Sequence, residues 1–107
     1  MVIKQYEIYW CDLNPTKGSE INKKRPCLVV SPNEMNRNIN TIMIAPITSA
    51  IKDYPTRVLI TIENKDGTIA LDQLRTLDKS RFENFIDKLS KEKIIEVKSK
   101  IKEMLVD

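Results

Sequence analysis

Hydrophobic and polar residues alternate along short segments of the first three-quarters of the chain, which is the pattern of half-buried β-strands. Turn-forming residues such as Asn, Gly, Ser and Pro separate these segments. Pro46, near the end of the third segment, indicates a strand end or an edge strand. The pattern predicts a small barrel or strongly curved sheet, with five short strands at residues 7–13, 26–30, 41–47, 56–63 and 68–77.

Two details of this pattern concern side-chain direction and turn position. In the first segment Trp10 shares a face with Ile8, and we expect Trp10 to point into the core. Between the fourth and fifth segments, residues 64–67 (NKDG) have the composition of a hairpin turn. The returning strand is therefore expected to begin at Thr68.

The last quarter of the chain changes to a helical period. Ser90 is a suitable N-cap, and Glu92 lies in the first turn, where negative charge is favourable. Residues 78–81 fit one helical turn, and residues 84–89 fit a sixth strand. The fold class is therefore mainly β with a C-terminal amphipathic helix, whose apolar stripe consists of Ile94, Val97, Ile101, Met104 and Leu105.

Length and composition limit the class of protein. The 107 residues, of which 41% are hydrophobic, support a single domain over residues 1–107 and exclude a disordered chain. No segment approaches the ~20 apolar residues that span a bilayer, and residues 1–10 lack the apolar run of a signal peptide. Two cysteines in strand-like segments, Cys11 and Cys27, indicate neither a disulfide framework nor a zinc site. We therefore expect a cytoplasmic protein without a membrane partner.

The chain contains no histidine, and this restricts its possible chemistry. Ser-His-Asp and Cys-His nucleophile systems are excluded, as is zinc chemistry that depends on histidine. Any catalysis must proceed without the usual proton carrier at neutral pH.

Positive charge is concentrated in one predicted loop. Residues 17–25 contain Lys17, Lys23, Lys24 and Arg25 against the single carboxylate of Glu20, although the net charge of the whole chain is only +3. A loop of this composition suits a polyanionic partner. From the charge count alone, a solvated loop that merely tolerates lysine is the favoured interpretation.

Three motifs follow one another along the chain. The first consists of residues 7–10 (EIYW) and 12–20 (DLNPTKGSE), followed by Arg25-Pro26. The second is residues 45–48 (APIT) and the third residues 71–78 (LDQLRTLD). In this order they resemble the three motifs of the MazF/PemK family of toxin endoribonucleases. The match covers the chain from about residue 6 to its end. It departs from the family at Tyr6, where that family usually has glycine.

The resemblance implies the fold and activity of that family. The expected fold is an SH3-like barrel of five to seven short strands, the PemK/CcdB-like toxin fold, assembled as a homodimer. The expected activity is sequence-specific cleavage of single-stranded mRNA without a metal or other cofactor, by a toxin of a toxin–antitoxin pair. The implied partner is an antitoxin with a disordered acidic-hydrophobic tail, and the pair would bind DNA as a complex.

The resemblance also assigns site residues. Arg25 and Thr48 correspond to the family's catalytic pair, and Glu20 to a glutamate that contributes in some members. The residue types suit attack of the RNA 2′-hydroxyl to form a 2′,3′-cyclic phosphate, because Arg25 can pair two phosphate oxygens and Thr48 can donate a hydroxyl proton. Glu20 is the candidate base, while Arg25 and water both remain candidates to protonate the leaving 5′-oxygen. Six further residues are candidate RNA-binding positions: Lys17, Ser19, Lys23, Lys24, Ser49 and Gln73.

Other interpretations of the same residues remain open. Relatives with this fold poison DNA gyrase without cutting RNA, through C-terminal aromatic and glycine residues that residues 104–107 (MLVD) do not include. A bare β-barrel interaction module would make Arg25 and Thr48 incidental. An alternative role for Glu20 is that of an ion-pair partner of a neighbouring lysine, and an alternative role for Asp72 and Gln73 is to brace loop backbone.

Overall fold

The computed structural model describes residues 2–21 and 23–106. Over these residues the chain forms seven strands, two α-helices and two short 3₁₀ helices. The strands are β1 (Glu7–Asp12), β2 (Lys24–Val29), β3 (Thr41–Thr48), β4 (Arg57–Ile62), β5 (Lys65–Ala70), β6 (Arg75–Asp78) and β7 (Phe82–Lys88). The helices are α1 (Asn33–Asn38), η1 (Leu71–Gln73), η2 (Lys79–Arg81) and α2 (Lys91–Leu105).

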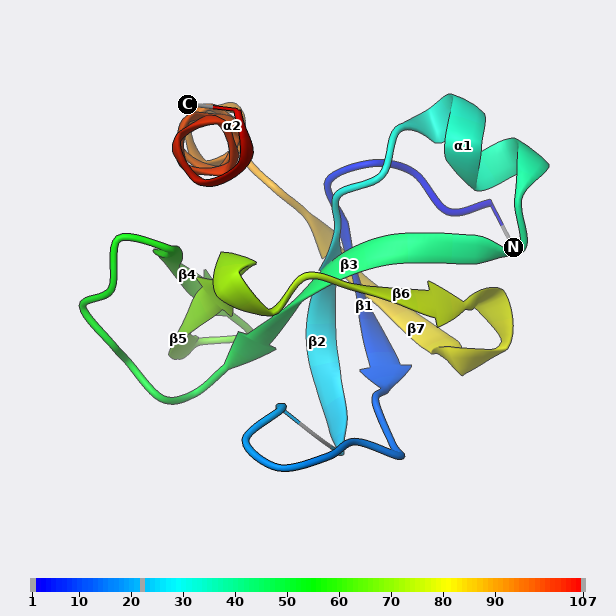
Figure 1. Ribbon diagram of the computed structural model, residues 1–107, viewed down its shortest axis with the longest axis horizontal. Helices are drawn as coiled ribbons and strands as arrows, with labels where there is room; N and C mark the ends of the chain where they lie inside the picture. The colour runs from blue at the N-terminus through cyan, green and yellow to red at the C-terminus, as the bar shows by residue number, and fades with distance from the viewer. Residues whose placement is uncertain (1, 22, 107) are drawn as a thin grey trace.

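The strands form one curled antiparallel sheet around β3 (Figure 1). Its order is β4-β5-β3-β2-β1-β7, and β6 also pairs with β3. Residues 41–44 of β3 pair with β6, whereas Ile47 and Thr48 pair with β5. This confirms the predicted mainly-β fold with a curled sheet and a C-terminal helix.

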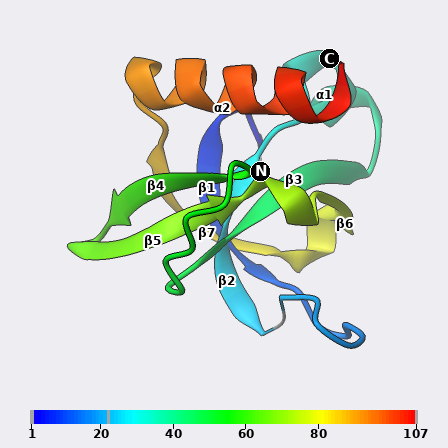
Figure 2. The ribbon, with the colours of Figure 1, turned by 60° about the vertical axis from the view of Figure 1, so that its left-hand side comes forward.

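The curled sheet buries apolar side chains on both of its faces. Successive residues of β1 enter different clusters, Ile8 on one side and Tyr9 on the other. Helix α2 lies across the Ile8 side above β4 and β5, and its Val97 is fully buried there (Figure 2). The Ser90 side chain accepts a hydrogen bond from the Lys93 N–H at 3.3 Å, which confirms the predicted N-cap. No helix in residues 2–21 and 23–106 is long and apolar enough to cross a membrane.

The hairpin between β4 and β5 turns earlier than predicted. The ladder closes at the pair Ile62–Lys65, so the turn consists of Glu63 and Asn64, with φ values of 51° and 65°. Two left-handed residues suit the twist of a two-residue hairpin loop, and this geometry outweighs the preference of Gly67 for turns. The prediction of a turn over residues 64–67 was therefore wrong, and Gly67 lies within β5 opposite Ile60.

The predicted strand over residues 68–77 is also interrupted. Strand β5 ends at Ala70, the 3₁₀ helix η1 follows, and β6 begins at Arg75. Asp72 and Gln73 consequently lie in η1 and not in the middle of a strand. The predicted helical turn and sixth strand after residue 77 are confirmed as η2 and β7.

Tyr6 occupies a backbone position that favours glycine. Its φ is 68°, in the left-handed region. Its N–H donates to the Val29 carbonyl, and its carbonyl accepts from the Leu89 N–H, both at 2.8 Å. These two bonds tie Tyr6 to the end of β2 on one side and to the segment before α2 on the other. The left-handed backbone that they require gives a physical reason for the glycine usual in the family it resembles.

Gly67 allows β5 to approach the end of β3. A Cβ atom at this position would lie 2.7 Å from the Thr48 carbonyl oxygen, which belongs to the backbone and cannot rotate away. We expect Gly67→Ala to lower the free energy of unfolding by about 1–3 kcal/mol, measured by urea denaturation. Lys65→Ala, at an exposed position of the same strand, is the control. Equal stability of Gly67→Ala and the wild type would contradict this close approach.

Candidate active site

Arg25 and Thr48 come together because of the register between β2 and β3. The recorded pairs are Cys27–Pro46, Leu28–Ala45 and Val29–Ile44. Continuing that register by two residues brings Arg25 opposite Thr48. Opposite residues of an antiparallel pair have their side chains on the same face. The two sequence motifs that contain Arg25 and Thr48 therefore meet at one end of the sheet.

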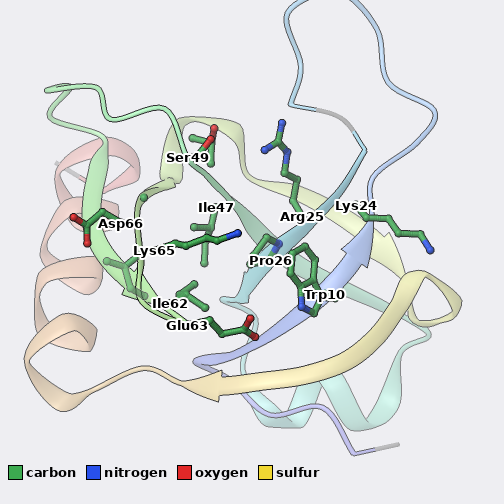
Figure 3. A pocket seen from close by; sticks show the side chains of 13 residues that line it. Trp10, Lys24, Arg25, Pro26, Ile47, Ser49, Ile62, Glu63, Lys65 and Asp66 are labelled. Carbon is green, nitrogen blue, oxygen red and sulfur yellow. The ribbon is translucent and has the colours of Figure 1, made fainter.

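The side chains at this end surround a hollow of about 300 Å³ (Figure 3). Arg25 and Ser49 lie near one another at one wall, and Lys65 extends from the opposite side toward Pro26. Apolar side chains form much of the lining. The lining residues are Trp10, Lys24, Arg25, Pro26, Ile47, Thr48, Ser49, Ile60, Ile62, Glu63, Lys65, Asp66 and Gly67. We call this the Arg25 hollow.

Thr48 is the last residue of β3, and only 9% of it is exposed. Its Oγ1 accepts a hydrogen bond from the Ala50 N–H at 3.2 Å. A hydroxyl group has one proton to donate and two acceptor positions. Because the Ala50 N–H occupies an acceptor position, the hydroxyl proton is left to donate to another group in the hollow.

The lysines of the basic loop have different surroundings. The Lys24 ammonium lies 3.0 Å from a carboxylate oxygen of Glu83, so its ion pair is with β7 and not with Glu20. The hydrogen bond and charge of Glu83 raise the pKa of the Lys24 ammonium. Lys23 has a φ of 69°, and its carbonyl accepts from the Leu13 N–H at 3.0 Å. Of the predicted RNA-binding residues, Lys24 and Ser49 line the Arg25 hollow, while Lys17 and Lys23 do not.

Glu20 lines a second hollow, of about 380 Å³. One oxygen of its carboxylate accepts the Lys17 N–H at 2.7 Å, within the same loop. Ser19 and Gln73 line this second hollow as well. The structure thus divides most of the predicted site residues between two hollows, while Lys17 and Lys23 line neither of them. It does not bring Glu20 into the lining of the Arg25 hollow.

Side chains of the 3₁₀ helix η1 hold two loops next to these hollows, the basic loop and the loop before β4. The Gln73 side-chain oxygen accepts the Ile21 N–H at 2.8 Å and so fixes the basic loop. The neighbouring Asp72 forms an ion pair with Arg57 at 2.7 Å and accepts a hydrogen bond from Thr56. Burial raises the pKa of the Asp72 carboxyl, but the bonds from Arg57, its own backbone and Thr56 outweigh burial and lower it. The interpretation that Gln73 braces loop backbone is confirmed.

The prediction that Trp10 points into the core was wrong, and the sequence did not indicate that Glu63 and Lys65 would line the hollow. Trp10 is half-buried and lines the Arg25 hollow, because its face of β1 is covered by core at Ile8 but opens into the hollow farther along. Glu63 and Lys65 reach the same hollow from the end of the β4–β5 hairpin. No local sequence signal identifies them, since their position depends on how the hairpin folds back toward β2. Within residues 2–21 and 23–106, no three His, Cys, Asp or Glu side chains are grouped as metal ligands.

The Gln73–Ile21 hydrogen bond can be tested with two substitutions. Gln73→Leu removes the acceptor, whereas Gln73→Glu keeps an oxygen at the same position. We expect the Ile21 amide to exchange about tenfold faster with solvent in Gln73→Leu, as the loss of one hydrogen bond implies, and to stay protected in Gln73→Glu. Amide hydrogen exchange followed by NMR measures both. Unchanged protection in Gln73→Leu would show that another group holds this loop.

Comparisons with known proteins agree with the motifs and the geometry. Residues 4–105 match the model of a family described as the PemK-like, MazF-like toxin of type II toxin–antitoxin systems. A protein named endoribonuclease MazF from Staphylococcus epidermidis is 36% identical over an alignment of 102 residues, which covers 90% of this chain and 85% of the relative.

Solved structures give the same result. A MazF crystal structure from Deinococcus radiodurans has a TM-score of 0.87 and 28% identity, and the match covers 98% of this chain and 97% of that one. A MazE–MazF crystal structure from the same organism has a TM-score of 0.81 and 29% identity, covering 98% and 96%. The family match spans nearly the whole chain and includes all three motifs. The chain therefore belongs to the PemK-like, MazF-like family of toxins of type II toxin–antitoxin systems.

Proposed function

We propose that this chain is an endoribonuclease toxin that cleaves single-stranded RNA in the Arg25 hollow without a metal ion. The observation that carries the proposal is that Arg25 and Thr48, from different motifs, line one hollow on neighbouring strands. The likeness to a protein named endoribonuclease MazF, at 36% identity over most of both chains, supports the same activity.

The proposed reaction is an internal transesterification. The 2′-oxygen attacks the adjacent phosphorus, the bond from phosphorus to the 5′-oxygen breaks, and the products are a 2′,3′-cyclic phosphate and a 5′-hydroxyl. The Arg25 guanidinium stabilises the additional negative charge of the transition state through two parallel hydrogen bonds. The Thr48 hydroxyl donates a hydrogen bond to a non-bridging oxygen of the phosphate. Arg25 or water supplies the proton that the leaving 5′-oxygen takes up.

Three carboxylates are candidates for the base that accepts the 2′-hydroxyl proton. Glu20 is the residue predicted from the sequence, and it lines the neighbouring hollow with one oxygen bonded to the Lys17 N–H. Glu63 and Asp66 line the Arg25 hollow itself. A base must come within about 3 Å of the oxygen whose proton it removes, directly or through one water, so Glu63 and Asp66 are further candidates.

Trp10 gives the Arg25 hollow a surface suited to a nucleobase. The hollow combines this half-buried aromatic ring with the apolar side chains of Ile47, Ile60 and Ile62. Stacking of a base on an aromatic side chain is worth about 1–3 kcal/mol in single-stranded nucleic-acid complexes. The six residues predicted to bind RNA would bind the flanking nucleotides: Lys17, Ser19, Lys23, Lys24, Ser49 and Gln73.

The proposed protein partners are a second copy of this chain and an antitoxin. The likeness to a MazF crystallised together with MazE supports a cognate antitoxin for this chain. A disordered segment with acidic and apolar residues would suit the Arg25 hollow, because its apolar floor is flanked by the cations of Lys24, Arg25 and Lys65. Such a segment would occupy the place of RNA and so prevent cleavage.

Cleavage of a long single-stranded RNA in the presence of EDTA tests the activity and its site. We expect the wild type to cut, and Arg25→Lys and Thr48→Val each to cut about 10²–10³-fold more slowly, the usual effect of removing one donor to a developing charge. Arg25→Lys keeps the charge but loses the planar fork. Lys98→Ala, on the exposed side of α2, is the control and should cut like the wild type.

The same assay separates the alternatives. Comparison of Glu20→Gln, Glu63→Gln and Asp66→Asn identifies the base, because the variant that lacks it should lose the greatest part of the cleavage rate. RNA left uncut by the folded wild type would refute the endoribonuclease proposal and leave gyrase poisoning or a plain interaction module. Wild-type rates in Arg25→Lys and Thr48→Val would refute the proposed site.

A further inference from the structure

Thr68 of β5 lies directly beside Thr48 and is almost completely buried. The two threonines are opposite one another in the β3–β5 ladder, and Thr68 is 1% exposed. The preceding residue, Gly67, lets β5 come close to the Thr48 carbonyl. The Thr68 side chain is thus buried beside the end of β3, where the chain leaves the sheet and enters the loop before β4.

Two hydrogen bonds connect the two hydroxyl groups through Ala50. The Thr68 Oγ1 donates to the Ala50 carbonyl at 3.0 Å. The Ala50 N–H in turn donates to the Thr48 Oγ1 at 3.2 Å. Ala50 follows the end of β3, and residues 49–56 form no helix or strand, so the Thr68 bond fixes the first part of this loop to the sheet.

Packing alone does not require a hydroxyl at position 68. Valine has nearly the same shape as threonine, fits a β-strand equally well and leaves no polar group to satisfy in a buried place. Burying a hydroxyl is favourable only when it forms a hydrogen bond, and here the bond is to the Ala50 carbonyl. The hydroxyl of Thr68 therefore serves the position of Ala50.

We infer that Thr68 is a positioning residue for the Thr48 hydroxyl, acting through Ala50. This inference rests on the proposed function of Thr48. The Thr68 bond holds Ala50 so that its N–H occupies one acceptor position of the Thr48 oxygen. With that position filled, the Thr48 side chain is kept in one orientation, and its proton is directed to a phosphate oxygen of the substrate.

Loss of the Thr68 hydroxyl should reduce the rate of the chemical step and leave substrate binding unchanged. Without the bond, the first residues of the loop move more freely, and Thr48 spends less time in the productive orientation. A donor that acts only in the transition state affects kcat and kcat/KM equally. We therefore expect Thr68→Val to lower kcat about tenfold, the factor that about 1.4 kcal/mol of lost transition-state stabilisation produces.

The experiment compares four variants on a short RNA that spans one mapped cut site. Thr68→Val removes the hydroxyl, and Thr68→Ser keeps it and should retain most of the rate. Thr48→Val removes the donor itself. In the double variant Thr48→Val/Thr68→Val, the Thr68 substitution should cost nothing further, because the group it positions is already gone. Circular dichroism confirms folding, and Thr68→Ala replaces Thr68→Val if the latter unfolds.

Exchange of the Ala50 amide hydrogen provides a readout that does not depend on RNA. The inference predicts faster exchange in Thr68→Val and wild-type exchange in Thr68→Ser. A Thr68→Val variant that cuts like the wild type would overturn the inference, while slow cutting by Thr48→Val would still uphold the proposed function. A further loss in the double variant would also overturn it. Wild-type cutting by Thr48→Val would refute the role of Thr48 and the inference together.

Discussion

The pairing of β2 with β3 stops at two prolines, and the site lies just beyond that stop. Pro26 and Pro46 have no N–H to contribute to a ladder, and the pairing ends at Cys27–Pro46. Arg25 and Thr48, which the same register would place opposite one another, follow directly and line one hollow together with residues of the β4–β5 hairpin. The register of this short ladder is therefore the constraint that brings the two side chains together.

The loops beside this hollow have little secondary structure, and single side chains hold them in place. Gln73 in η1 fixes the basic loop at Ile21. Asp72 in the same 3₁₀ helix fixes the far end of the loop before β4, and Thr68 fixes its near end. These braces come from β5 and from η1, which directly follows it. The site is therefore held both by the strands that carry Arg25 and Thr48 and by the side chains that brace the neighbouring loops.

Features that depend on local pattern could be predicted from the sequence, whereas features that depend on how the strands curl could not. The helical period of α2, its Ser90 cap and the motifs around Arg25 and Thr48 are local, and they were predicted. Period-two alternation gives the face of Trp10 but not whether that face is covered, so Trp10 was wrongly assigned to the core. The separation of Glu20 from the Arg25 hollow and the contribution of Glu63 arise from the curvature of the sheet.

A double-mutant cycle on Arg25 and Thr48 tests whether the two side chains act on one phosphate. The cycle measures single-turnover cleavage by the wild type, Arg25→Lys, Thr48→Val and the double variant. If both groups stabilise the same transition-state charge, their losses are coupled, and the double variant is slower by less than the product of the two single factors. A loss equal to that product would show that the two residues act independently and would contradict the shared site.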